Sequence, residues 1–283
     1  AAPTPLAGER QMARGISIHI GVNHPAGMHE LLARSEATAW KLAELSYQAG
    51  YRSIHVLRGA EATREAVGAL LASAAPTLRP GHTLFVSFSG HGSRQIDPHG
   101  DERDGWDEAW CLHDADLLDD ELAEYWRLLA PGTRALVVAD CCFAAGSLRR
   151  PHLPMIWCGA QPYAGWDGLV YRGVKQAPVA LGVFTPPAHD DGIRASVLLL
   201  AATGEQQKAR EGLYMQHLLE VWAGGAFRGS FRELHDRVSE RVRREAHDQD
   251  PQLLMLGAPD PGFPLETAFH LDLPVMRGRG GSY

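Results

Sequence analysis

The stretch HTLFVSFSGHG at residues 82–92 decides how the rest of the sequence is interpreted. Its first eight residues are rich in aromatic and β-branched side chains and show no helical period, which predicts a strand. A second such run, LVVAD at 136–140, follows the turn-forming residues PGTRA and precedes two adjacent cysteines. Both runs are predicted strands, and both end beside residues that can take part in chemistry.

Outward from these two runs, strands and helices alternate along the chain. Short runs of strand type occur at 15–22, 52–57 and 196–203. Apolar residues at helical spacing predict helices at the remaining positions: 36–49, 61–74, about 213–223 and 231–247. Strands separated by helices form right-handed βαβ units and a parallel sheet. The predicted fold class is α/β, with a central, mostly parallel sheet of about six strands and helices on both faces.

Two stretches interrupt this alternation. Residues 94–110 are acidic and rich in turn formers, and 147–192 contain many Pro, Gly and aromatic residues without a period. A long loop of the second kind inside a compact domain is usually functional or disordered. We therefore expect one domain over 15–270 with a linker or loop insertion at 147–192. Residues 1–14 are expected to be an arm and 271–283 a tail.

Composition excludes several classes of protein. The chain has 283 residues, of which 45% are hydrophobic and 22% charged, as in ordinary globular proteins. Its net charge of -7 provides no basic surface for nucleic acid or for anionic membranes. Only four cysteines are present, and Cys141 directly precedes Cys142, unlike a disulfide framework. These features predict a cytoplasmic protein without nucleic-acid or membrane partners, and no nucleotide-binding glycine motif is present.

The ends of the two central strands carry the candidate chemistry. The first continues into Ser89-Gly90-His91-Gly92, and the second ends in Asp140-Cys141-Cys142. Parallel sheets bind ligands beyond the carboxyl ends of their strands, so the imidazole and one of the thiols can form a base and nucleophile pair. Gly92 can bring its backbone N–H close to a substrate carbonyl. A structural histidine and a buried, inert cysteine remain the alternative, and alternation along the chain does not choose between the two cysteines.

The pair of motifs FSGHG and DCCFAAGS resembles those of the caspase-like cysteine peptidases, in particular their metacaspase and bacterial branch. The stretch DGWDEAWCLHDADLLDDEL at 104–122 and the stretch GEQQKARE at 204–211 are similar to further parts of that family. The resemblance implies a caspase-like fold, with a large-subunit-like part at 15–146 and a small-subunit-like part at 193–270. The region between them, 147–192, corresponds to one that is often self-cleaved.

The resemblance also implies roles for individual residues. His91 is the base and Cys142 the nucleophile of a cysteine endopeptidase, and the backbone N–H groups of Gly92 and Cys142 form the oxyanion hole. Asp140 and Ser89 line the pocket for the substrate residue before the cut, P1, which implies a preference for Arg or Lys. The family's second pocket acid is replaced here by Thr38, which implies looser selectivity.

Calcium and the nature of the substrate are further expectations. Many metacaspases are activated by calcium, which implies a weak site at Asp107, Asp119 and Asp120, although a solvated turn and a helix cap explain these acids equally well. No cofactor is required by the expected chemistry, and the expected partner is a protein or peptide substrate. Two other functions fit the same motifs: a catalytically silent binding module of caspase type, and another thiol enzyme that transfers acyl groups.

Overall fold

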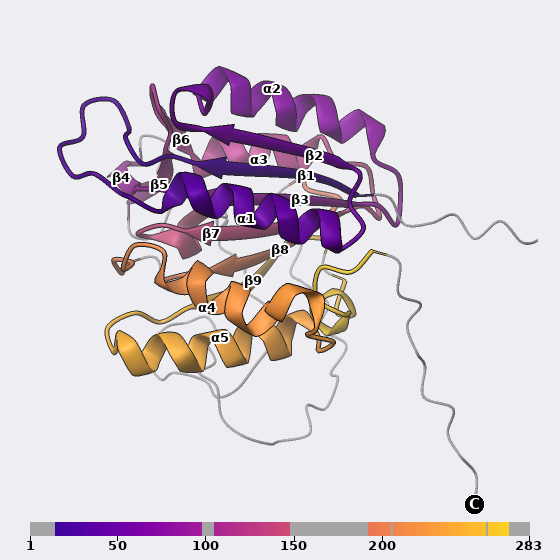
Figure 1. The fold of residues 1–283 in the computed structure, drawn as a ribbon. Coiled ribbons are helices and arrows are strands. Elements are labelled where there is room, and N and C mark those ends of the chain that lie inside the picture. Colours follow the sequence, from indigo (N-terminus) through magenta and orange to yellow (C-terminus); the bar gives the residue numbers. More distant parts are fainter. Residues whose placement is uncertain (1–14, 98–104, 148–191, 205, 259, 272–283) are drawn as a thin grey trace, which may run out of the picture.

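A computed structural model describes residues 15–97, 105–147, 192–204, 206–258 and 260–271. Its centre is a six-stranded sheet with the order β2-β1-β3-β7-β8-β9, in which only β9 runs antiparallel to its neighbour (Figure 1). The strands are β1 (Gly15–Gly21), β2 (Ser53–Arg58), β3 (Thr83–Ser89), β7 (Arg134–Asp140), β8 (Ser196–Ala201) and β9 (Gln252–Gly257).

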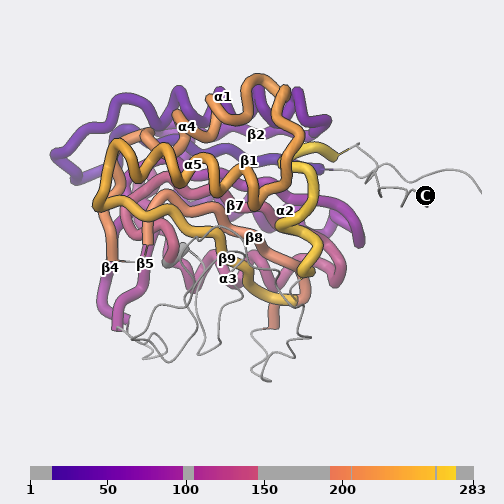
Figure 2. The backbone as a smooth tube through the Cα atoms, turned by 90° about the horizontal axis from the view of Figure 1, so that it is seen from below, coloured from indigo at the N-terminus to yellow at the C-terminus, as the bar shows by residue number. Residues whose placement is uncertain are grey.

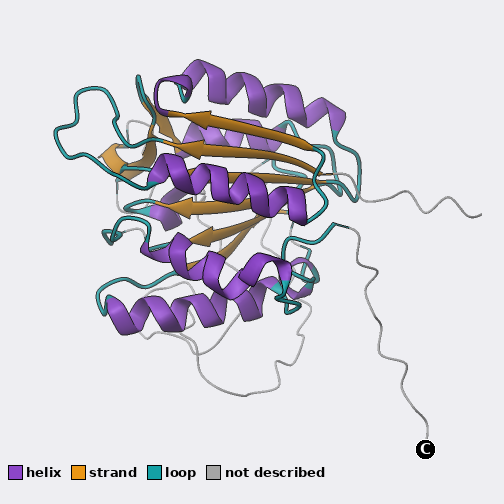
Figure 3. Ribbon diagram, in the orientation of Figure 1, coloured by secondary structure: helices purple, strands orange, loops and turns teal. Residues whose placement is uncertain are grey.

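In the described part of the chain, five α-helices cover the two faces of this sheet. Helices α1, α4 and α5 lie on one face and α2 and α3 on the other, as the two perpendicular views show (Figures 2 and 3). The side chain of Thr63 caps α2, and Ser230 and Glu233 form a capping box at α5. The helices are α1 (Ser35–Gln48), α2 (Arg64–Ala74), α3 (Asp119–Arg127), α4 (Leu213–Trp222) and α5 (Phe231–Glu245).

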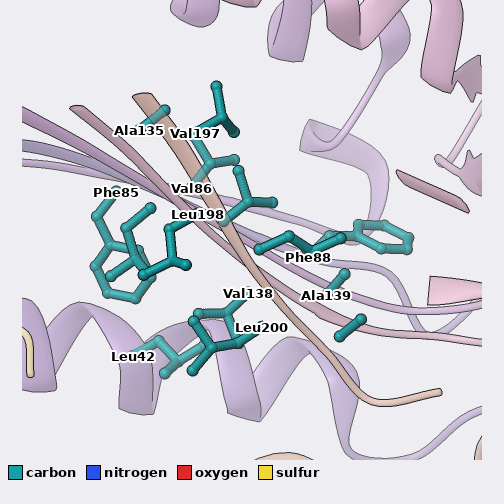
Figure 4. Close-up of a cluster of buried hydrophobic side chains, with 14 of the residues drawn as sticks. Leu42, Phe85, Val86, Phe88, Ala135, Val138, Ala139, Val197, Leu198 and Leu200 are labelled. Carbon is teal, nitrogen blue, oxygen red and sulfur yellow. The ribbon is translucent and has the colours of Figure 1, made fainter. Parts of the chain in front are cut away.

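The core follows from strands that are apolar on both faces. Every residue of β3 and of β8 is buried, as expected where helices cover both sides of a sheet. Val138 and Leu200 lie beside Leu42 of α1, whereas Phe88 points away from that helix (Figure 4). On that opposite side, the ring of Phe88 stacks on that of Trp110 at 4.8 Å. The central strands are therefore held from both faces, and their ends are fixed relative to one another.

A second, smaller sheet lies beside the carboxyl ends of the central strands (Figure 1). Its strands pair antiparallel in the order β4-β5-β6. They are β4 (Gly92–Ile96), β5 (Trp106–Cys111) and β6 (Asp116–Leu118). The prediction of a turn-rich stretch at 94–110 was therefore wrong at both ends, which are strands. Cross-strand pairs bring Trp106 opposite Ile96 and Ala109 opposite Ser93.

The fold class predicted from the sequence is confirmed: the sheet has six strands, is mostly parallel and is covered on both faces. The five strands and four helices expected along the chain are present with bounds shifted by a few residues. The sixth strand, β9, had no sequence assignment. The expected arm at 1–14, most of the linker at 147–192 and most of the tail at 271–283 lie outside the described residues. Among the described residues, no helix has the length and apolar character needed to cross a membrane.

Candidate active site

The register between β3 and β7 brings the two candidate motifs together. Ser89 and Asp140, the last residues of the two strands, are direct partners in the parallel pair. The N–H of Gly90 donates to the carbonyl of Asp140 at 3.3 Å. His91 and the cysteine pair therefore leave the sheet from adjacent strand ends, where open parallel sheets form their binding crevices.

One backbone carbonyl holds the imidazole of His91. Its Nε2 lies 2.9 Å from the carbonyl oxygen of Glu30, in the loop between β1 and α1. A carbonyl can only accept, so Nε2 carries the proton, and in the neutral ring Nδ1 is left as an acceptor. The backbone of His91 is fixed as well, because its carbonyl accepts from the N–H of Cys111 at 3.0 Å. The ring is thus oriented with one basic nitrogen available.

The two adjacent cysteines differ in their exposure to solvent. Cys141 is buried, with 2% of its surface exposed, whereas Cys142 is partly exposed and its Sγ lies 3.4 Å from the N–H of Ala209. The third described cysteine, Cys111, is fully buried, and burial raises the pKa of its thiol to about 12. Of the described cysteines, only Cys142 is accessible to a substrate.

Gly92 lies against the backbone of Cys142. A Cβ at position 92 would overlap the carbonyl oxygen of Cys142, so the close approach requires glycine. The carbonyl of His91 accepts from the N–H of Cys111, opposite it in the ladder, and the alternation of an antiparallel pair then turns the N–H of the next residue on β4 away from β5. The N–H of Gly92 is therefore directed out of the small sheet, on the strand that contacts Cys142.

Asp140 is a buried carboxylate, and few neighbouring groups stabilise its charge. Its side chain is 4% exposed, and neither oxygen has a hydrogen-bond partner of good geometry among the described residues. Burial raises the pKa of Asp140 to about 7; the nearby N–H of Met215 lowers the pKa, and the charge of Glu211 raises it. Burial, with the charge of Asp140, also raises the pKa of the Tyr214 hydroxyl. Such an acid is suited to receive a cationic group.

The other predicted pocket residues lie on neighbouring elements. Ser89 is buried opposite Asp140, and Thr38 is buried on α1. The carboxylate of Glu36, also on α1, is directed to the end of β2: a Cβ at Gly59 would be 3.2 Å from its Oε1. Since β1 and β3 separate β2 from β7, Glu36 does not supply a second acid beside Asp140.

Sequence reasoning missed three groups that contact or neighbour these residues. Two are backbone groups, the carbonyl of Glu30 and the N–H of Ala209, for which no side-chain pattern exists. The third is the carboxylate of Glu211, which precedes α4. Acids just before helices are common, so the sequence offered no reason to select Glu211. The structure places it near Asp140, whose pKa its charge raises.

The acids expected to bind calcium lie on two neighbouring elements. Asp107 on β5 and Asp119 at the start of α3 are both 1% exposed. Among the described residues, no group of three His, Cys, Asp or Glu side chains that could hold a metal is found. The calcium site stays a prediction. Three further acids of this region, Asp101, Glu102 and Asp104, lie outside the described residues.

Comparison with solved structures defines the class of fold. A protein from Geobacter sulfurreducens is 26% identical with a TM-score of 0.67, and the match covers 91% of this chain and 99% of that one. Caspase-1 from Spodoptera frugiperda is 15% identical with a TM-score of 0.55, over 96% of this chain and 98% of that one. The chain therefore has the caspase fold.

Within that fold, the sequence matches are to metacaspases. Residues 26–151 match the family model "Metacaspase, peptidase C14 domain". Metacaspase-1B from Aspergillus fumigatus is 38% identical over 80 residues, covering 26% of this chain and 20% of the relative. Metacaspase-5 from Trypanosoma cruzi is 29% identical over 201 residues, covering 68% of this chain and 44% of the relative. The resemblance to caspase-like peptidases of the metacaspase branch is confirmed, and the chain spans less than half the length of either relative.

Proposed function

We propose that the chain is a cysteine endopeptidase of metacaspase type that uses Cys142 and His91 as a dyad. The observation that carries the proposal is the placement of an accessible thiol and an oriented imidazole at the ends of adjacent strands, β7 and β3. The catalytically silent alternative lacks support, because neither member of the pair is missing. The acyl-transfer alternative uses the same thiol and is decided by whether peptide bonds are hydrolysed.

The geometry is consistent with the following steps. Nδ1 of His91 takes the proton of the Cys142 thiol, and the sulfur attacks the carbonyl carbon of the scissile peptide bond. The N–H groups of Gly92 and Cys142 hold the developing oxyanion. His91 then gives its proton to the departing amine, which leaves an acyl thioester on Cys142. Water attacks that thioester, His91 accepts a proton from the water, and the free thiol is restored.

The cleavage assay is the primary test. A library of peptides varied at P1 is incubated with the chain, with and without calcium, and the cut positions are determined by mass spectrometry. Hydrolysis at defined peptide bonds, together with labelling of Cys142 by a thiol-directed peptidyl inhibitor, supports the proposal. A chain that labels but transfers acyl groups without hydrolysing peptides is an acyltransferase, and a chain that does neither is a binding module. The calcium arm tests whether the ion is needed.

Asp140 makes Arg or Lys the expected P1 residue. Asp140→Asn keeps the shape of the side chain and removes its charge, so a cationic P1 group loses its buried partner. Loss of one member of such a pair costs about 2–5 kcal/mol, so we expect kcat/KM for an Arg peptide to fall by about 100-fold. The matched substrate carries citrulline, which is neutral and nearly isosteric with Arg. The role of Asp140 in P1 selection is contradicted if Asp140→Asn cleaves both peptides with the same kcat/KM as the unmodified chain. It is also contradicted if the unmodified chain cleaves fastest after Asp.

The same carboxylate predicts a pH dependence. Below a pH of about 7, Asp140 is mostly protonated and cannot pair with a guanidinium; above it, the side chain is mostly charged. The ratio of kcat/KM for the Arg peptide to that for the citrulline peptide should therefore rise as the pH increases through about 7. The ratio cancels the titration of the dyad, which both substrates share. In Asp140→Asn the ratio should stay flat, and a ratio that falls with increasing pH contradicts the prediction.

A further inference from the structure

The segment between β8 and α4 contacts the Cys142 side of the site directly. Within it, the N–H of Ala209 lies 3.4 Å from Sγ of Cys142. The carbonyl of Gln207 accepts from the N–H of Phe143, the residue after Cys142, at 2.9 Å. Gln207 is itself held, since its Oε1 accepts from the N–H groups of Gly204 and Asp250 at 3.0 and 3.1 Å. This segment is therefore a fixed support for the nucleophile.

The same segment reaches the His91 side through one side chain, that of Glu211. Its Oε1 accepts from the backbone N–H of Ala33 at 2.5 Å and from that of Arg34 at 2.6 Å. These two N–H groups precede α1, whose N-cap residue Arg34 makes no side-chain cap, and in the first turn the N–H of Glu36 donates to Oδ1 of Asn23 at 3.2 Å. A carboxylate at this position satisfies donors that the helix cannot satisfy and favours the positive end of its dipole. Glu211 thus fixes the end of the loop before α1.

That loop is the one that orients the imidazole. Glu30, whose carbonyl accepts from Nε2 of His91, lies three residues before Ala33. Within the loop, the N–H of Leu32 donates to the carbonyl of Asn23 at 3.0 Å, which closes residues 23–32 on themselves. The N–H of Ala26 donates to the carbonyl of His113 at 2.7 Å. The loop is also held at its start, where the N–H of Val22 donates to the carbonyl of Ser89 at 3.0 Å. Of these anchors to other segments, the one at Ala33 and Arg34 is nearest to Glu30 along the chain, so we expect it to affect where the Glu30 carbonyl lies.

We propose that Glu211 is a positioning residue for His91: its carboxylate anchors the loop 22–34 so that the Glu30 carbonyl holds Nε2 as a donor and leaves Nδ1 to serve as the base. The inference rests on the proposed peptidase function for its catalytic consequence, but the link from Glu211 to His91 is a property of the fold. One segment then supports both members of the dyad, Cys142 through a backbone N–H and His91 through the loop.

The test compares two substitutions of similar size. Glu211→Gln keeps an oxygen that can accept from both N–H groups, whereas Glu211→Met keeps the length of the side chain and removes the acceptor. Misplacement of a catalytic group by about 1 Å can cost on the order of 100-fold in rate, so we expect kcat to fall by 10- to 100-fold in Glu211→Met with little change in KM. Glu211→Gln should recover most of the rate.

A second readout does not depend on turnover. Two-bond ¹H–¹⁵N correlations of the imidazole, assigned with His91→Ala, report which ring nitrogen carries the proton. At a pH where the ring is neutral, we expect the Nε2–H tautomer in the unmodified chain and in Glu211→Gln, and a mixture of tautomers in Glu211→Met. The control is Glu233→Met, which removes a carboxylate that caps α5 and accepts from the N–H of Ser230 at 2.7 Å.

The outcomes separate this inference from the proposed function. If the unmodified chain cleaves no peptide but its His91 tautomer responds to Glu211→Met alone, the peptidase proposal fails and the positioning link stands. If the chain is an active peptidase and Glu211→Met retains both its kcat and its tautomer, the positioning role is refuted. Equal loss in Glu211→Gln and Glu211→Met also refutes it, because the charge and not the hydrogen bonds would then be responsible.

Discussion

Replacing Cys142 by alanine should reduce peptide cleavage by on the order of 10⁴-fold or more, because loss of a nucleophile forfeits the covalent pathway. Cys141→Ala should keep most of the activity. The two residues are adjacent in the sequence, but Cys141 is buried beneath the end of β7 and Cys142 is partly exposed. The measurement is kcat/KM for a fluorogenic peptide with Arg at P1, made on both variants and on the unmodified chain.

Labelling provides the control for this prediction. A peptidyl inhibitor that alkylates thiols should modify the unmodified chain and Cys141→Ala once each, at Cys142, and should leave Cys142→Ala unmodified. Mass spectrometry of the digested protein locates the label. Circular dichroism spectra that match the unmodified chain exclude unfolding as the cause of inactivity. An inactive Cys141→Ala beside an active Cys142→Ala would show that the nucleophile is assigned to the wrong cysteine.

Parts of the fold whose residues are buried on both faces could be predicted from the sequence. The runs that became β3 and β8 have strand length, are rich in apolar residues and lack a helical period, which is typical of buried strands. Strand β9 escaped prediction although its apolar residues are similar. It follows directly after Asp250 and Pro251, and it pairs antiparallel with β8 at the edge of the sheet, although α4 and α5 lie between the two strands in the chain. Its pairing depends on tertiary contacts, which the local sequence pattern does not predict.

The small sheet shows a different limit. Strand β4, with the sequence GSRQI, is half exposed and polar, and it becomes a strand because β5 pairs with it. Its stability comes from cross-strand pairs and from Arg94, whose guanidinium lies 4.4 Å from the centre of the Phe143 ring. These contacts join residues distant in the chain. Acidic and turn-forming residues nearby dominate the local composition, which therefore predicted a turn-rich loop.

The candidate site was predictable where side chains carry the chemistry. His91, Cys142 and Asp140 lie at or just after the ends of two predicted strands, and the pairing of β3 with β7 brings them to one edge of the sheet. The choice of Cys142 over Cys141 and the role of Asp140 came from the family resemblance. The contacts of the Glu30 carbonyl and the Ala209 N–H could not be predicted, because every residue has such groups and only the folded chain selects two of them. The side-chain pattern therefore indicates the candidate groups, and the backbone around them determines their orientation.

Substitution of Gly92 by alanine should lower kcat by about 100- to 1,000-fold, the effect typical of losing one oxyanion-hole donor. Alanine adds a Cβ that overlaps the carbonyl oxygen of Cys142, and backbone cannot yield as the end of a flexible side chain can. Either the end of β4 or the turn after β7 must shift, which moves the N–H of Gly92 relative to the sulfur. Alkylation by a small thiol reagent develops no oxyanion, so its rate should change far less than kcat.

The control is Gly105→Ala: a Cβ there meets no atom within 4 Å, although its φ of 76° adds local strain far from the dyad. Equal loss of cleavage in both glycine variants, or unchanged cleavage in Gly92→Ala, would remove Gly92 from the oxyanion hole.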